Sequence, residues 1–265
     1  MPGGTVIIDS HTHVQRVDGF WDSPPERILE LMDSAGIDMS VIMPYSDSPS
    51  LVDYTADSAR LHPRLIPYAR LNPGDPGSLQ LLEDGVRKLG VRGLKLHPVG
   101  NHVHPAQAES LELISLAADL GIPTLFHCGD EEFTLPLQVA AAARALPDAM
   151  IIMGHMGGYF HTNDAIEAAV RWENIYLETS AMPYPGVIHQ AVKRIGSRRV
   201  LFASDGPGCP PDLELLKVKM AGLDRDQLRK VMGENIAELL KISPGEFLQR
   251  THSANPRKSY SASKL

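Results

Sequence analysis

Residues 93–127 contain the pattern from which the fold of the chain is most readily predicted. It reads GLKLH at 93–97, QAESLELISLAADL at 107–120 and PTLFH at 123–127. The two outer segments are short and mostly apolar, which is typical of strands that are covered on both faces. The middle segment spaces its apolar residues as a helix does. A strand, a helix and a second strand in this order predict a parallel β–α–β unit.

The same alternation extends in both directions along the chain. Amphipathic segments, such as Pro25–Ser34 and Ser78–Leu89, predict helices between further apolar segments. Eight strands alternating with helices predict an α/β fold, a (β/α)8 TIM-like barrel. A doubly wound open sheet has a similar pattern, but the glycine-rich nucleotide turn that usually follows its first strand is absent. The other predicted strands are Val6–Asp9, Met39–Pro44, Leu65–Leu71, Met150–His155, Ile175–Thr179 and Val200–Ala203.

The organisation along the chain indicates one domain. A length of 265 residues fits one large α/β domain, and no linker or longer repeat divides the sequence. We expect the barrel to occupy residues 1–250, with two helices at Arg225–Met232 and Glu234–Lys241 that close it. The polar stretch at residues 251–265 predicts a flexible tail.

Composition and charge exclude several classes of protein. A net charge of −7 without a long basic run argues against nucleic acid as a partner. No apolar run is long enough for a transmembrane helix, so no membrane partner is expected. Two cysteines, Cys128 and Cys209, cannot form a disulfide scaffold, and the N-terminus lacks the pattern of a signal peptide. We therefore expect a cytoplasmic protein, or a peroxisomal one if the source is eukaryotic, because the chain ends in Ser263-Lys264-Leu265.

Histidines are concentrated at the ends of the predicted strands. The sequence has 11 histidines, of which His11 and His13 follow the first strand at a spacing that points both side chains to one face. His127, His155 and Asp205 end the fifth, sixth and eighth strands. The carboxyl ends of all strands in a parallel barrel open onto one face, so these side chains are predicted to line one cavity. Imidazoles with a carboxylate are a suitable ligand set for one divalent ion, Zn²⁺ first and Mn²⁺ second.

Taken together, the motifs resemble the metal-dependent amidohydrolase superfamily over about residues 5–241. The closest branch is the amidohydrolase-related group that also contains aminocarboxymuconate-semialdehyde-type decarboxylases. The family fold is a (β/α)8 barrel, in agreement with the strand pattern. The resemblance is carried by Ile8-Asp9-Ser10-His11-Thr12-His13, Leu94-Lys95-Leu96-His97-Pro98, His127, Gly154-His155-Met156-Gly157-Gly158, Ser204-Asp205-Gly206-Pro207 and Met232-Gly233-Glu234-Asn235-Ile236.

The resemblance implies a role for each of these polar positions. His11, His13, His127 and Asp205 match metal ligands, and His155 matches a histidine that assists catalysis. Asp205 is also expected to orient a metal-activated water and to accept its proton. A carboxylate at Asp9 could fix the tautomer of a nearby imidazole.

Other residues at strand ends have two interpretations each. Lys95 stands where some members of the family carry a carbamylated lysine that bridges two metals, and otherwise it pairs with a substrate carboxylate or a nearby acid. Arg70 is a candidate clamp for a substrate carboxylate, or else a salt bridge on the barrel rim. His97 is a candidate substrate-binding residue. Tyr45 and Glu178 are each as well explained by a role in the active site as by a purely structural role.

The chemistry follows from the ligand set. The main prediction is a metal-dependent hydrolase that acts on a C–N, ester or lactone bond of a small organic substrate. The alternative is a metal-dependent, non-oxidative decarboxylase of a small unsaturated carboxylic acid. An aromatic content of 6% favours hydrolysis, because a decarboxylase of flat acids should present aromatic side chains and a positive clamp. A purely structural ion is disfavoured, since structural zinc is usually closed by thiolates. The resemblance is also compatible with a homodimer.

Overall fold

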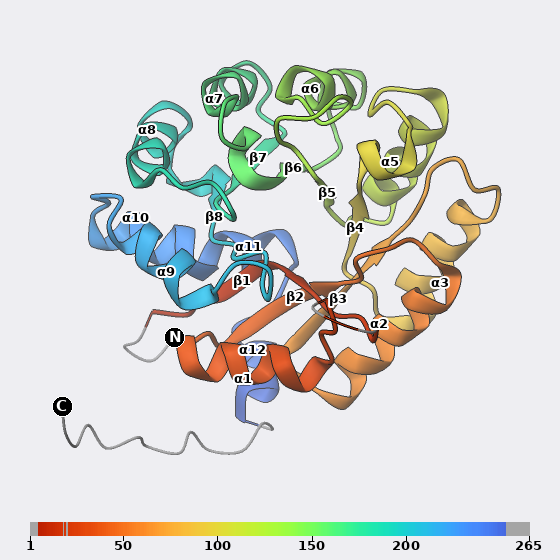
Figure 1. Ribbon diagram of the computed structural model, residues 1–265, viewed down its shortest axis with the longest axis horizontal. Coiled ribbons are helices and arrows are strands. Elements are labelled where there is room, and N and C mark those ends of the chain that lie inside the picture. Colours follow the sequence, from red (N-terminus) through yellow and green to blue (C-terminus); the bar gives the residue numbers. More distant parts are fainter. Residues whose placement is uncertain (1–4, 18, 20, 253–265) are drawn as a thin grey trace.

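The predicted barrel is present in the computed structural model, which describes residues 5–17, 19 and 21–252 (Figure 1). Within that part of the chain, eight strands form one sheet in chain order, and every neighbouring pair in that order is parallel. The strands are β1 (Ile8–His13), β2 (Met39–Met43), β3 (Leu65–Arg70), β4 (Gly93–Leu96), β5 (Thr124–Phe126), β6 (Ile151–Met153), β7 (Ile175–Glu178) and β8 (Val200–Leu201).

The segment after β8 closes the barrel against β1. The Ser10 backbone NH donates to the carbonyl of Phe202 (3.1 Å), and the Asp205 NH donates to the carbonyl of His11 (2.8 Å). The His13 NH in turn donates to the carbonyl of Gly206 (2.8 Å). Closure therefore brings the two ends of the barrel sequence side by side and puts Asp205 next to the histidines of β1.

Helices surround the strands, as Figure 1 shows. Helices α1, α2, α6, α8 and α9 begin at a proline, whose fixed φ suits a first turn. Helices α1 and α3 end at glycines in the left-handed region, Gly36 and Gly90. The helices are α1 (Pro25–Ala35), α2 (Pro49–Leu61), α3 (Ser78–Leu89), α4 (Pro98–Asn101), α5 (Ala108–Asp119), α6 (Pro136–Ala145), α7 (Thr162–Arg171), α8 (Pro185–Ile195), α9 (Pro211–Lys219), α10 (Arg225–Arg229), α11 (Asn235–Leu239) and α12 (Pro244–His252), with short turns η1 (Gly154–Gly157), η2 (Ser197–Arg199) and the π-turn η3 (Lys230–Glu234).

Two apolar layers hold the barrel together. One layer packs strand residues such as Ile42 and Phe126 against the helices. The other gathers strand residues such as Val41 and Leu125, which neighbour the first set along the strands, together with residues of α11. Because successive strand residues point to opposite faces, the second layer is the filled interior of the barrel. The strand ends above this filling carry the polar side chains of the site.

The expected tail lies mostly outside the described residues. Helix α12 includes Thr251 and His252, and residues 253–265, with the terminal Ser263-Lys264-Leu265, are not described. No helix in the described ranges is both long and apolar enough to span a bilayer.

Gly233 allows the closing helices to pack on β1. A Cβ at this position would lie 2.4 Å from the carbonyl oxygen of Val6 and 3.3 Å from the backbone nitrogen of Ile8. Neither backbone atom can move without shifting the sheet. We expect Gly233→Ala to lower the free energy of unfolding by about 1–3 kcal/mol, measured by urea unfolding. Gly186→Ala in α8 is the control, because a Cβ there meets nothing within 4 Å. Equal stability of the two variants would contradict the prediction.

Candidate active site

The centre of the site consists of two histidines of β1 and the carboxylate that follows β8. His13 Nε2 lies 2.9 Å from Asp205 Oδ1, and His11 Nε2 lies 3.4 Å from the same oxygen. Both histidines are buried, whereas the Asp205 side chain keeps 26% of its surface exposed. The structure therefore brings together three of the four predicted metal ligands.

Burial keeps both imidazoles neutral at pH 7. Desolvation is the largest cause that lowers the pKa of His11 and of His13, and the charge of Lys95 adds to it. For Asp205, burial alone would raise the pKa, but the electrostatic influence of the adjacent His11 and the hydrogen bond with His13 outweigh it and hold the pKa below its usual range. The cluster therefore offers lone pairs on nitrogen and an ionised carboxylate.

These donors fit a divalent ion. His11, His13 and Asp205 each present one ligand atom within 4.8 Å of the other two. Neutral imidazole and carboxylate are ligands that zinc and manganese accept.

His127 and His155 form a pair beside this cluster. His127 Nδ1 lies 3.1 Å from His155 Nε2, and the His155 ring centroid lies 5.3 Å from that of His11. His97 stacks on His127 with ring centroids 4.3 Å apart. The fourth predicted ligand, His127, thus contacts its neighbours rather than Asp205. Burial lowers the pKa of His127, so its ring is neutral as well.

Glu178 is the residue whose importance the sequence left undecided. It ends β7, is fully buried, and its Oε1 lies 3.0 Å from His11 Nδ1. The same oxygen accepts from the backbone NH of His155 (2.9 Å). Glu178, His11 and His155 also form a second group of potential metal ligands. The available signal was its place at a strand end, in line with His127 and His155.

Among the residues that the structure describes, Asp9 forms no hydrogen bond with an imidazole ring and so does not fix a histidine tautomer, the role that its position two residues before His11 suggested. Its Oδ1 accepts from the Ser204 NH (2.9 Å) and the His11 NH (3.2 Å), and its Oδ2 accepts from the Ser204 hydroxyl (2.5 Å). Asp9 therefore pins the closing segment to β1. The carboxylate that meets the His11 imidazole is Glu178, because barrel closure turns Asp9 toward β8.

Lys95 is buried at the end of β4 and also contacts the cluster. Its Nζ lies 3.1 Å from His11 Nε2. Burial lowers the pKa of this amine to about 7. Lys95 is therefore close enough to influence any ion that His11 holds.

Arg70 is buried at the end of β3 within a polar network. Its Nε donates to Asp47 Oδ1 (2.7 Å), whose other oxygen accepts from the Asn101 amide (2.5 Å). In the described part of the chain, neither Nη group of Arg70 donates a hydrogen bond to protein. His97 Nδ1 accepts from the Gly100 NH at the start of α4 (3.2 Å). Arg70 thus combines a structural ion pair with uncommitted donors.

Aromatic side chains from two loops cover His13. The Tyr45 ring stacks on His13 with centroids 4.3 Å apart, and the half-exposed Trp21 packs edge-on against Tyr45 at 5.2 Å. A low aromatic content therefore does not keep aromatic rings away from the site. Their loops follow β1 and β2, and sequence spacing cannot show where loop side chains lie.

Strained backbone also occurs at the site. His155, Met156 and Asp205 have φ of 58°, 48° and 65°, in the left-handed region that residues with a Cβ rarely adopt. Such conformations persist where surrounding structure imposes them, and they are frequent at functional sites. Here they place His155 and Asp205 just beyond β6 and β8.

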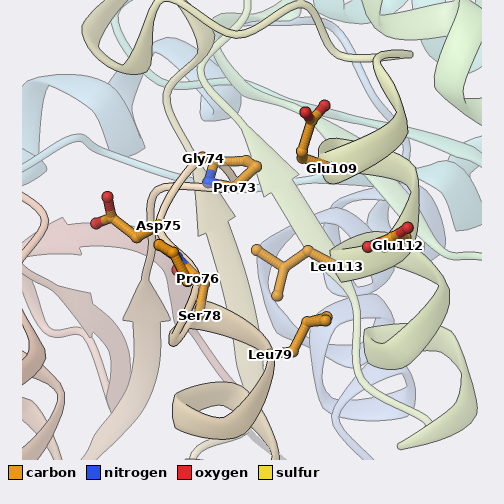
Figure 2. A pocket seen from close by; sticks show the side chains of 9 residues that line it. All are labelled: Pro73, Gly74, Asp75, Pro76, Ser78, Leu79, Glu109, Glu112 and Leu113. Carbon is orange, nitrogen blue, oxygen red and sulfur yellow. The ribbon is translucent and has the colours of Figure 1, made fainter.

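A surface hollow elsewhere has a different character. It encloses about 280 Å³ between the loop after β3 and helix α5. Figure 2 shows its acidic groups, Asp75, Glu109 and Glu112, around Leu79 and Leu113. It contains none of the histidines or other site residues described above.

The chain belongs to the amidohydrolase family, which its sequence matches over residues 8–242. No curated protein matches it by sequence alone.

Solved structures share its fold at low sequence identity. The 5-carboxyvanillate decarboxylase LigW from Sphingomonas paucimobilis has 17% identity and a TM-score of 0.72, over 91% of this chain and 100% of that one. A dihydroxybenzoic acid decarboxylase from Polaromonas sp. JS666, solved with manganese and 2-nitroresorcinol, has 18% identity and a TM-score of 0.74, over 92% and 99%. A putative amidohydrolase from Staphylococcus aureus has 15% identity and a TM-score of 0.74, over 89% and 99%.

Proposed function

We propose that this protein is a metal-dependent, non-oxidative decarboxylase of a small aromatic or unsaturated carboxylic acid. The observation that carries the proposal is the combination of Tyr45 and Trp21 beside His13 with the buried guanidinium of Arg70. A flat acid needs both an apolar wall and a positive clamp. The similarity in fold to two aromatic acid decarboxylases supports the same choice.

In this proposal His11, His13, His127 and Asp205 hold one divalent ion, zinc or manganese. The manganese in the Polaromonas enzyme supports the second of these metals. The ion supplies positive charge that stabilises negative charge developing on the substrate. Carbamylation of Lys95 would add a second ion, and about two metal equivalents per chain, rather than one, would indicate it.

The side chains of this protein then bind and orient the substrate. The free Nη groups of Arg70 are suited to bind its carboxylate, because guanidinium pairs with carboxylate in a two-pronged geometry. Tyr45 and Trp21 pack against its ring, and His97 lines the wall formed with His127.

Decarboxylation breaks the bond between the ring and the carboxylate carbon. The electron pair stays on the ring carbon, CO₂ leaves and a proton takes its place. Asp205 is the candidate to carry that proton, because 26% of its side-chain surface is exposed whereas Glu178 is fully buried among donors. His155 is assigned to assist, through the contacts it makes with its neighbours.

Hydrolysis of a C–N or ester bond is the second candidate. The same histidines and Asp205 could orient a water and accept its proton, and the Staphylococcus aureus structure shares the fold. The test incubates zinc-loaded and manganese-loaded protein with hydroxybenzoic acids in one panel and with amides and lactones in another. Release of CO₂ from the acids supports decarboxylation. Ring opening or amine release without CO₂ would replace it with hydrolysis.

Arg70 offers a sharper prediction for the same reaction. Arg70→Met should raise KM for a carboxylate substrate about 10- to 100-fold, the loss expected for charge-assisted hydrogen bonds. Arg60→Met is the control, because Arg60 also pairs with an aspartate, Asp57, but on the exposed surface of α2. Steady-state kinetics measure both variants. An unchanged KM in Arg70→Met would show that Arg70 does not bind the substrate carboxylate and serves only in its ion pair with Asp47.

A further inference from the structure

A continuous series of hydrogen bonds connects Glu178 to His127. Glu178 Oε1 lies 2.9 Å from the Ser180 hydroxyl, and that hydroxyl lies 2.9 Å from His155 Nδ1. On the other side of its ring, His155 Nε2 lies 3.1 Å from His127 Nδ1. All four side chains belong to the ends of β5, β6 and β7, so the series runs across three neighbouring strands.

The first two bonds have a fixed direction. A carboxylate only accepts, so the Ser180 hydroxyl donates to Glu178 and its oxygen accepts from His155 Nδ1. The Ser180 backbone carbonyl lies 3.3 Å from the same Nδ1 and also only accepts. Two acceptors therefore require that His155 Nδ1 carries the hydrogen.

The donor and acceptor in the bond between His155 and His127 follow from the first two bonds. In the form of His155 that carries one N–H, Nε2 is the bare nitrogen and accepts from His127 Nδ1 (3.1 Å). His127 then carries its hydrogen on Nδ1, and its Nε2 keeps a lone pair. The same Glu178 oxygen lies 3.0 Å from His11 Nδ1, which frees the Nε2 of His11 in the same way.

We propose that Ser180 and His155 are positioning residues that hold His127 in its Nδ1–H tautomer, with Nε2 left to bind a divalent ion. This inference rests on the metal site of the proposed function. It also implies that Glu178 sets the tautomers of two imidazoles, that of His11 on β1 directly and that of His127 at the end of β5 through Ser180 and His155. Ligand orientation by such outer hydrogen bonds typically affects metal affinity 10- to 100-fold.

The tautomers are measured directly on the metal-free, ¹⁵N-labelled protein by NMR of the imidazole nitrogens at pH 8. The expected result is an Nδ1–H tautomer for both His127 and His155. An Nε2–H tautomer of His127, or a doubly protonated His155, overturns the proposal. This measurement needs no variant and no substrate, so it is independent of whether the protein is a decarboxylase.

The second measurement is the affinity for Zn²⁺ by calorimetry. Ser180→Ala should weaken binding about tenfold or more, with a mixture of His127 tautomers in the NMR spectrum. Ser180→Thr retains a hydroxyl and should restore both readouts. Ser34→Ala, on the exposed side of α1, is the control and should match the unchanged protein. Unchanged zinc affinity and an unchanged His127 tautomer in Ser180→Ala would show that Ser180 does not position His127.

Discussion

The double replacement His11→Ala and His13→Ala is expected to abolish binding of one divalent ion and, with it, turnover. The Nε2 atoms of His11 and His13 both face the Asp205 carboxylate. Without them only His127 and Asp205 remain of the four proposed ligands, which is too few to hold a zinc or manganese ion against water. Metal content per chain, measured by plasma mass spectrometry after equilibration with zinc, checks the result. The folded state should persist, because the double variant removes polar groups above the apolar filling of the barrel.

The matched control for this experiment is His102→Ala with His104→Ala. These two histidines have the same spacing, but His102 ends α4 and His104 accepts from the Ala106 NH in the following loop. The control should retain full metal content. Full retention in the variant of β1 would refute the assignment of His11 and His13 as ligands.

The second large effect is expected from Asp205→Asn. Asparagine retains the shape of the side chain but neither the negative charge nor the ability to take up a proton. We expect kcat to fall by about 10²–10⁴ even at saturating metal, the range typical for loss of acid–base catalysis. Assays at increasing zinc or manganese separate this loss from weaker metal binding.

Asp148→Asn is the control for Asp205→Asn. Asp148 is exposed in the loop between α6 and β6, at the opposite end of the barrel from the site. Its replacement should leave kcat unchanged. A kcat of Asp205→Asn close to that of the control, once metal is saturating, would show that Asp205 is a ligand without a role in proton transfer.

Much of the fold is readable from local patterns. Apolar segments of strand length alternate with amphipathic segments, and the eight strands follow in the predicted order. Boundaries are less predictable. Strand β1 continues through His13, because barrel closure supplies hydrogen bonds to His13, whereas β8 ends at Leu201. Such bonds depend on residues almost 200 positions away and leave no local pattern.

The candidate site, like the fold, can be predicted from the sequence only in part. Strand order places His11, His13 and Asp205 at one end of the barrel, and the spacing of β1 residues directs both imidazoles to one side. The tertiary structure decides which carboxylate meets which imidazole. Asp9 is close to His11 in sequence but binds Ser204, whereas Glu178, 167 residues away, meets the His11 ring.

Patterns along the chain are enough to predict the barrel, the family and the main candidate ligands. The way Tyr45 and Trp21 cover His13, and the hydrogen bonds from Glu178 through Ser180 and His155 to His127, follow only from the folded structure. The physical reason is that strand patterns arise from burial, which repeats along the chain. Loop packing and hydrogen-bond direction depend on distances between segments that meet only when the barrel closes.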